Sequence, residues 1–375
     1  MPEHKWKDVA DPVTFTNENP VATGPFTEVK TFQNQIYELG KNPNYWQKGK
    51  PAVEGLRFPA YPGNDQANLA LIEVDWAGNF VPDIDKTYVA KDPENNHYWF
   101  PLVGGTVTLY PNATKKPFDD IKLRKAISMA IDRAQIAKIA VNGYTVGADG
   151  TGLDDAYARW RNEKAAAAGD WTNYDVAKAN ALLDEAGYAK GADGIRAKDG
   201  KPLKFDINVV TGWSDWVRAV QITTQNLKAV GIDASLKTAF FEALQKGTFD
   251  MSMGWTNTEP TPFNFYRDLM APEFVKPVNE ATTRNWHRFA AKEAEPLFKK
   301  FAAATDPAEQ KSIIDELQMI YAQQVPVIPL FKNPSWGEYS TKRFVGWPSK
   351  ENPYAKLSPN NSPDYLLVLT EIKPK

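Results

Sequence analysis

The alternation of apolar and polar positions is clearest between residues 203 and 240. Apolar and β-branched residues cluster over 203–210, which is typical of a buried strand. Apolar residues then recur at helical spacing, and we expect Ser214 or Asp215 to cap this helix and Gly231 to end it. Residues 232–240 predict a second strand. Together they predict a βαβ unit with parallel strands, and therefore an α/β fold.

Other segments predict further elements by the same patterns. Two alternating runs over residues 24–40 predict a hairpin. Residues 117–143 predict one long helix with Asp119 and Asp120 in its first turn and Gly143 at its end. Residues 248–255 predict a strand that runs into a polar loop. Residues 306–324 predict a helix that feeds a proline-containing strand, which we expect at a sheet edge.

Tryptophans follow two of the predicted strands at the ends where open α/β sheets bind ligands. Trp213 and Trp216 lie in the turn TGWSDW, and their spacing directs both to similar sides of the first helical turn, so at least one should face a cleft. Trp255 ends a strand and precedes the polar loop TNTEP, so we expect it to face the cleft. Trp76 and Asn79 occupy a similar strand end. For each tryptophan, packing in the core is the alternative.

Composition narrows the classes of function. The 375 residues include 44 Lys and Arg against 46 Asp and Glu, so no charged footprint for nucleic acid or an anionic membrane is present. The 12 Trp, 15 Tyr and 19 Phe exceed the needs of a core, and we expect a share of them to line a pocket. No cysteine occurs, and the three histidines lack metal-ligand spacing, so we expect no metal site and no cofactor. No signal peptide is visible at the N-terminus.

The familiar catalytic motifs are lacking from the sequence. It contains no G-x-S-x-G, no H-E-x-x-H and no dinucleotide fingerprint. A glycoside hydrolase needs only two carboxylates ~5–10 Å apart, and the abundant acidic residues leave that alternative open. The profile favours a binding protein over an enzyme.

Several segments, in order, resemble family 5 solute-binding proteins of ABC importers, which include oligopeptide, dipeptide, nickel and cellobiose-type binding proteins. The resemblance rests on NPVATGPFTEVKTF, NPNYW, PFDDIKLRKAISMAIDR, LLDEAGY, LKAVGIDA, FDMSMGW and VPVIPLF. Ala22 stands where the family usually has glycine. The chain also begins about where the family's middle begins, so we expect lobe I to be incomplete.

The resemblance implies a two-lobed α/β fold of the periplasmic-binding-protein type (class II). Residues 1–110 would form part of lobe I, 111–332 lobe II, and 333–375 a return to lobe I. A ligand would lie between the lobes and be enclosed by hinge closure. The implied partners are a solute and the permease subunits of an ABC transporter, and the implied location is the periplasm or the cell surface. We expect a monomer.

The resemblance also bears on the ligand. In peptide-binding members, the tryptophan matching Trp255 is followed three residues later by an aspartate that pairs with the ligand's amino terminus, and here Thr258 stands there. A buried ammonium without a counter-charge is costly, which favours an oligosaccharide such as a cellobiose-like β-glucoside. An oligopeptide, with Asp215 or Glu259 holding its amine, is the alternative. The predicted ligand-binding residues are Trp213, Asp215, Trp216, Trp255, Asn257, Trp76 and Asn79.

Overall fold

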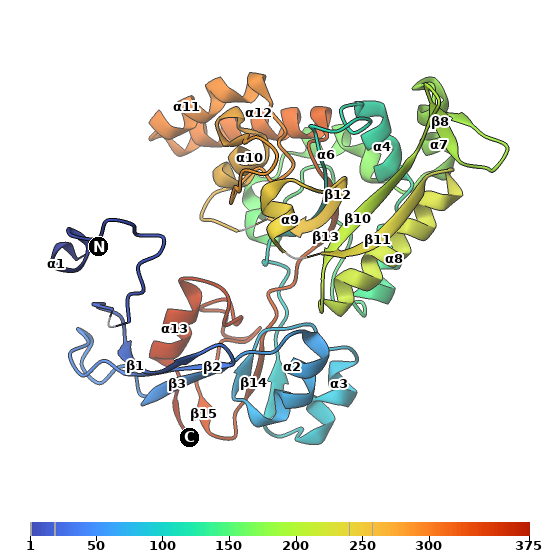
Figure 1. Ribbon diagram of the computed structural model, residues 1–375. Coiled ribbons are helices and arrows are strands. Elements are labelled where there is room, and N and C mark those ends of the chain that lie inside the picture. The colour runs from blue at the N-terminus through green and yellow to red at the C-terminus, as the bar shows by residue number, and fades with distance from the viewer. Residues whose placement is uncertain (1, 19, 240, 257) are drawn as a thin grey trace. The chain divides into compact units, whose positions relative to one another are not determined.

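The chain forms two compact units. The computed structural model describes residues 2–18, 20–239, 241–256 and 258–375 (Figure 1). Unit 1 comprises Met1–Phe100 and Ser335–Lys375, and unit 2 comprises Pro101–Pro334. Among the described residues, no helix combines the length and the apolar character that crossing a membrane requires.

A five-stranded mixed sheet forms the centre of unit 2, in the order β11-β10-β12-β6-β13. Strand β10 runs parallel to β11 and β12, and β6 runs antiparallel to β12 and β13. The predicted parallel βαβ unit is therefore confirmed, and so is the edge position of the proline-containing strand β13. The strands are β6 (Thr106–Pro111), β10 (Lys204–Val210), β11 (Asp233–Ala239), β12 (Met251–Trp255) and β13 (Ile328–Lys332).

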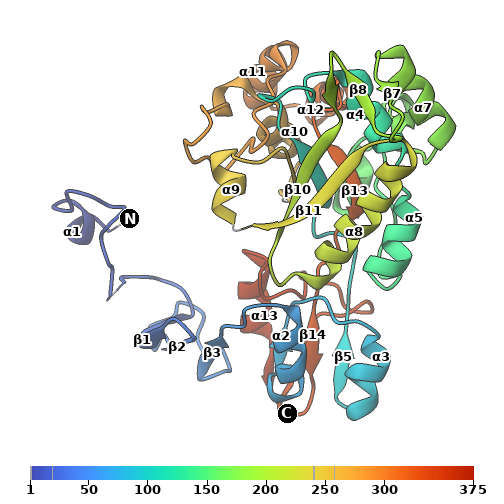
Figure 2. The same cartoon turned by 45° about the vertical axis from the view of Figure 1, so that its right-hand side comes forward.

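Helix α8 (Ser214–Ala229) lies along β10 and β11 (Figure 2). Gly231 follows it with a φ of 81°, so the predicted stop is confirmed. The predicted cap is wrong, because Trp213 is the N-cap and its side chain makes no capping hydrogen bond. Gly212, with a φ of 89°, makes the turn out of the strand, and the helical backbone begins directly after Trp213.

The helix predicted over residues 117–143 is broken in two. Helix α4 (Ile121–Met129) begins at Asp120, whose carboxylate accepts the Lys122 N–H at 2.9 Å. Asp132 then caps a new start, because its carboxylate accepts the Gln135 N–H at 2.9 Å. That start is α5 (Arg133–Gln135), which continues as the π-helix Ile136–Ala140. A single helical pattern in the sequence thus hides an internal cap.

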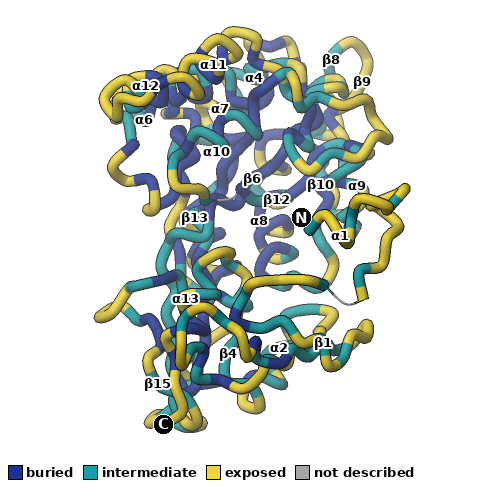
Figure 3. Tube along the Cα trace, turned by 90° about the vertical axis from the view of Figure 1, so that its left-hand side faces the viewer, coloured by how far each residue is buried: buried dark blue, intermediate teal, exposed yellow. Residues whose placement is uncertain are grey.

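The remaining helices of unit 2 group around the ends and faces of the sheet. They are α6 (Glu163–Ala168), α7 (Val176–Glu185), α9 (Phe241–Lys246), α10 (Phe263–Met270), α11 (Glu295–Ala303) and α12 (Pro307–Gln324). A small sheet adds β7 (Ala189–Lys190), β8 (Arg196–Lys198) and β9 (Lys201–Pro202). Figure 3 shows the central strands β6 and β12 buried, while α11 and α12 turn exposed faces outward.

Unit 1 is built from short strands around its own core. The predicted hairpin is confirmed as β1 (Phe26–Gln33) and β2 (Ile36–Lys41), and β3 (Gly55–Pro59) extends it. A second sheet has the order β4-β14-β5. The apolar core of unit 1 includes Trp347, Leu357 and Val368. The other elements are α1 (Glu3–Trp6), α2 (Asn64–Ala70), β4 (Trp76–Ala77), α3 (Ile84–Thr87), β5 (Asn96–Tyr98), β14 (Glu338–Ser340), β15 (Phe344–Val345), α13 (Asp364–Glu371) and β16 (Lys373–Pro374).

The boundaries between the two compact units differ from the predicted boundaries between the lobes. The prediction placed a boundary after residue 110, whereas the units divide between Phe100 and Pro101. Strand β6 lies inside the sheet of unit 2, with β12 on one side and β13 on the other, so its backbone hydrogen bonds assign it to that unit. At the other end, the units divide between Pro334 and Ser335, close to the predicted return at residue 333.

A buried arginine ties α4 to the end of α12. Arg124 is 4% exposed and donates to three backbone carbonyl oxygens, those of Phe118 (2.7 Å), Gln324 (2.7 Å) and Val325 (2.8 Å). Burial lowers the pKa of this guanidinium to about 10, so it stays charged at neutral pH. Its planar guanidinium therefore supplies hydrogen-bond donors to backbone carbonyl oxygens at the C-terminal end of α12, just before the chain enters β13.

We predict that Arg124→Lys lowers the free energy of unfolding by ~2–4 kcal/mol, because an ammonium cannot reach three carbonyls in that geometry. Arg218→Lys on the exposed side of α8 is the matched control and should change it by less than ~0.5 kcal/mol. Urea unfolding followed by circular dichroism measures both. Equal effects for the two variants would contradict the structural role of Arg124.

Candidate ligand-binding site

Six aromatic side chains of unit 2 form one continuous cluster, which we call the aromatic wall. Neighbouring ring centroids lie 4.8–5.9 Å apart, within the range of favourable aromatic contact. The wall joins segments that are far apart in the sequence. It consists of Tyr110, Trp213, Trp216, Phe241, Trp255 and Trp286.

Trp255 is the centre of the aromatic wall. Its ring centroid lies 5.7 Å from Trp213, 5.9 Å from Trp216, 5.6 Å from Phe241 and 5.5 Å from Trp286. The ring of Phe241 is stacked on it at an interplanar angle of 28°. Trp255 is partly exposed, so a ligand can reach part of its surface.

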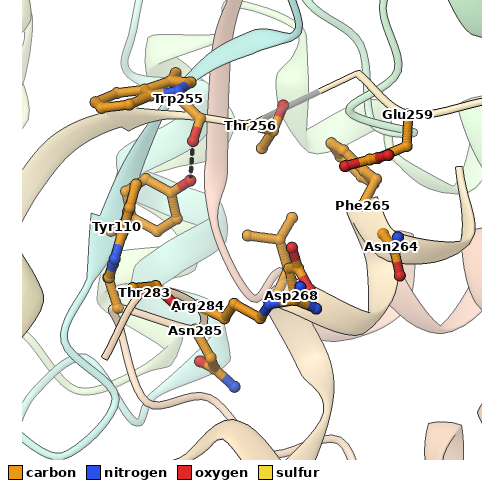
Figure 4. Close-up of a pocket in the computed structure, with 12 residues that line it drawn as sticks. Tyr110, Trp255, Thr256, Glu259, Asn264, Phe265, Asp268, Thr283, Arg284 and Asn285 are labelled. Atoms are coloured by element: carbon orange, nitrogen blue, oxygen red, sulfur yellow. Dashed lines mark hydrogen bonds and ion pairs between the residues drawn. The ribbon is translucent and has the colours of Figure 1, made fainter. Parts of the chain in front are cut away.

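Two features hold Trp255 at the end of β12. The Tyr110 hydroxyl donates to its backbone carbonyl oxygen at 2.8 Å (Figure 4). Just before it, Gly254 leaves room for the Tyr110 ring, because a Cβ there would lie 2.4 Å from Tyr110 Cε2. The backbone at Trp255 is therefore held by buried packing and by a hydrogen bond within the protein.

The structure brings the predicted tryptophans of unit 2 together but buries one of them. Trp213 is partly exposed and meets Trp216 edge to face at 4.8 Å. Trp216 is 4% exposed, as is Asp215, so both lie beneath the surface that Trp213 and Trp255 present. Asn257, also predicted as a ligand contact, lies outside the described residues.

Trp76 and Asn79 belong to unit 1 and have internal partners there. The Trp76 Nε1–H donates to the Leu357 carbonyl oxygen at 2.5 Å, and its ring packs against Trp347 at 5.7 Å. The side-chain amide of Asn79 donates to Asn68 Oδ1 at 2.5 Å. Both residues are partly exposed, so their role in ligand binding stays a prediction.

Thr258 stands where peptide-binding members of the family have an aspartate, and it forms a hydrogen bond with a buried carboxylate. Its hydroxyl donates to Asp154 Oδ2 at 3.0 Å or to the Val103 carbonyl oxygen at 3.2 Å. Asp154 is 4% exposed, and the same oxygen accepts the Gly105 N–H at 2.7 Å. The carboxylate therefore fixes the backbone at the entry to β6, a role that no sequence motif signals.

A pocket opens beside Trp255, between β12, α10 and the segment 283–286 (Figure 4). It holds about 50 Å³ of space that water can occupy. Trp255 and Trp286 line it on one side, and Asp268 and Arg284 form an ion pair of 2.9 Å on another. Burial raises the pKa of Asp268, and the neighbouring Arg284 offsets part of that rise. The sequence analysis did not predict Trp286, Asp268 or Arg284 as site residues, because none of them lies at the end of a predicted strand.

The described residues contain no group of three His, Cys, Asp or Glu side chains that could hold a metal ion. His287 lies beneath the aromatic wall, fully buried, with its ring 5.3 Å from that of Tyr110. Burial lowers its pKa to about 3, so the imidazole is neutral at physiological pH. It therefore adds an uncharged aromatic ring to the packing rather than a charge to the site.

A family model described as "Bacterial extracellular solute-binding proteins, family 5 Middle" matches residues 1–274. The chain belongs to this family. The resemblance read from the sequence is thereby confirmed, and solved relatives confirm the two-lobed α/β fold of periplasmic binding proteins.

Curated relatives and solved structures give the range of the family. The chain is 24% identical to di/tripeptide-binding protein 2 of Pseudomonas aeruginosa over 94% of its own length and 62% of that protein's. It is 28% identical to the glutathione-binding protein of Shigella dysenteriae over 83% and 59%. The chain thus spans about three fifths of the length of these relatives.

One solved structure is a mannohexaose-bound periplasmic oligopeptide-binding protein of an oligopeptide ABC transporter from Thermotoga maritima. It matches all of this chain and 73% of its own, with 26% identity and a TM-score of 0.90. The oligopeptide-binding protein of Bacillus subtilis in complex with a nonapeptide matches with 21% identity and a TM-score of 0.81, which shows a shared fold. The family's relatives therefore include binders of peptides and of a sugar.

We predict that Tyr110→Phe lowers the free energy of unfolding by ~1–2 kcal/mol, because the Trp255 carbonyl oxygen loses its donor in a packed site. Tyr174→Phe removes a hydroxyl from a side chain that is 51% exposed in the same unit, and should have little effect. Denaturant titration with tryptophan fluorescence reads both stability and the surroundings of the wall. A Tyr110→Phe variant as stable as the control would show that this hydrogen bond does not hold Trp255.

Unit 1 contains an acid that is neutral at physiological pH. Glu338 on β14 is fully buried and accepts the Asn79 N–H at 3.3 Å. Burial raises its pKa to about 8, above that of an exposed glutamate. Because the folded state binds this proton more tightly than the unfolded state, its contribution to stability is complete below about pH 4.5 and lost as the pH rises through 8.

We predict that Glu338→Gln removes this pH dependence. Between pH 5 and pH 8 the wild type should lose stability relative to the variant, on the order of 1 kcal/mol per pH unit. Glu73→Gln, on an exposed side chain of unit 1, is the control and should run parallel to the wild type. Chemical unfolding at several pH values measures the difference. Parallel curves for wild type and Glu338→Gln would refute the buried neutral acid.

Proposed function

We propose that this chain is the solute-recognition component of an ABC importer and that it binds an oligosaccharide outside the cytoplasm. Membership of an extracellular solute-binding family supports the general role. The mannohexaose-bound relative, at 26% identity over the whole chain, supports the class of ligand. Transfer of the solute to the permease subunits is part of the same proposal.

The aromatic wall is the main structural support for an oligosaccharide ligand. Trp213, Trp255 and Trp286 are each partly exposed within one set of mutually packed rings. Sugar rings present C–H faces that stack on flat aromatic surfaces, so each exposed ring of the wall can bury apolar area of a sugar. Several adjacent rings suit an oligosaccharide better than a single sugar.

Of the other predicted residues, some are proposed to support the aromatic wall and the rest to contact the ligand. Trp216 and Asp215 support Trp213 from below, since both are buried. Asn257, Trp76 and Asn79 are proposed to contact the ligand directly. Enclosure of the ligand between two lobes likewise stays a prediction from the family resemblance.

An oligopeptide is the second candidate, favoured by the names of the curated relatives. Glu259 is exposed and lines the pocket beside Trp255, so its carboxylate can meet a peptide amine there. Asp215, the other acid considered for that role, is buried. Tight binding of short peptides without binding of sugars would establish this candidate.

Hydrolysis of the sugar is the remaining alternative. The relatives reported above are binding proteins, which favours a ligand that is released unchanged. Incubating the chain with a β-linked oligosaccharide and analysing the products decides this point. Intact recovery supports binding, and shortened products would establish a hydrolase.

We predict that β-linked glucan or mannan oligosaccharides raise the melting temperature of the chain, because a ligand that binds only the folded state stabilises it. The rise should fall at least by half in Trp255→Ala and in Trp213→Ala, which remove stacking surfaces. Trp46→Ala changes a side chain that is 76% exposed in unit 1, outside the proposed site, and should keep the full rise. Thermal unfolding with and without sugar measures all four proteins.

A rise with peptides and none with sugars would refute the oligosaccharide proposal and leave the family role intact. A rise with sugars that survives both tryptophan substitutions would place the ligand elsewhere than on the aromatic wall.

A further inference from the structure

The pocket beside Trp255 shares that tryptophan with the aromatic wall, and we call it the polar pocket. Trp255 and Trp286 contribute aromatic surface to its lining. Asp268, Arg284 and Asn264 supply polar groups (Figure 4). The side chains of Arg284 and Asp268 are 42% and 31% exposed, so a bound molecule can reach both. Trp255 thus belongs both to the aromatic wall and to the lining of the polar pocket.

The charges of the polar pocket select for a hydroxyl group. The Asp268 carboxylate accepts a hydrogen bond from Arg284 Nη1 at 2.9 Å, which places an acceptor directly beside a donor. A hydroxyl can donate to the first and accept from the second. A ligand carboxylate would face Asp268 and Glu259, and a ligand ammonium would face the Arg284 guanidinium. A neutral hydroxyl avoids both repulsions.

The size of the polar pocket limits what enters it. Its 50 Å³ of water-accessible space corresponds to roughly three to five water molecules, at ~10–15 Å³ for each. A group of a few atoms suits that space better than a whole pyranose ring does. One carbon bearing one hydroxyl does fit, with the carbon against the tryptophan rings and the oxygen toward the ion pair.

We propose that the polar pocket receives the exocyclic hydroxymethyl group of a hexose ring stacked on Trp255, and that the site thereby prefers hexose-built over pentose-built oligosaccharides. This inference rests on the proposed oligosaccharide function. It adds a specificity determinant, the Asp268–Arg284 pair with Asn264, to the stacking surface.

The test compares two sugars that differ only in that group. Cellotetraose and xylotetraose have the same β-1,4 backbone, but the xylose units lack the hydroxymethyl group. Calorimetric titration of the full chain should show at least tenfold tighter binding of cellotetraose. Asp268→Ala should weaken cellotetraose binding about tenfold, because a hydrogen bond to a charged group is lost, and should leave xylotetraose binding within about twofold.

Two further variants make the test decisive. Asn264→Leu replaces a polar lining group by a bulkier apolar one, and it should also reduce the preference for cellotetraose. Glu273→Ala is the matched control, because it breaks a comparable ion pair, Arg267–Glu273 at 2.9 Å, on a residue that does not line the pocket. That control should bind both sugars as the wild type does. Circular dichroism confirms that each variant is folded.

The outcomes separate the inference from the function beneath it. Equal affinity of the wild type for both sugars overturns the role of the polar pocket while the oligosaccharide function stands. The same holds if Asp268→Ala and Asn264→Leu, both folded, keep the full preference for cellotetraose. Absence of binding for both sugars in the wild type overturns the oligosaccharide function, and the inference falls with it.

Discussion

The antiparallel pairing of β6 with β12 places Val107 opposite Trp255 at the end of the central strand of unit 2. The two segments approach so closely there that a Cβ on Gly105, which has a φ of 89°, would lie 1.8 Å from the Thr256 carbonyl oxygen. Asp154 and Thr258 reinforce this approach, and Tyr110 fixes the carbonyl of Trp255 from the facing strand. The aromatic wall and the polar pocket both depend on that fixed tryptophan.

Around Trp255 the protein presents two chemically different surfaces side by side. One is flat and apolar, and the other places a carboxylate next to a guanidinium. Micromolar affinity requires ~8 kcal/mol, whereas burial of one large apolar side chain contributes only ~1.5–3 kcal/mol. No single ring would therefore account for binding, and the proposed oligosaccharide function relies on the continuity of the wall together with hydrogen bonds in the pocket.

Elements that follow from the local sequence pattern were predictable, whereas contacts between residues far apart in the sequence were not. The βαβ unit and the edge strand β13 follow from periodicity and proline. Trp213 and Trp255 were predicted as ligand contacts because the first follows a strand and the second ends one. The break inside residues 117–143 depends on Asp132 acting as a cap, which the helical pattern hides. Asp268 and Arg284 meet only through the tertiary fold, so neither carried a signal. The burial of Trp216 likewise depends on Trp213 and Trp255 covering it.

The most direct test of the central claim, that sugar rings stack on the aromatic wall, is saturation-transfer NMR on the full chain. The sample contains an equimolar mixture of a β-linked tetrasaccharide and short peptides, and aromatic protons of the protein are irradiated. We predict strong transfer to the C–H protons of the sugar rings, weakened in Trp255→Ala, with little transfer to the peptides. Transfer to the peptides alone would contradict it.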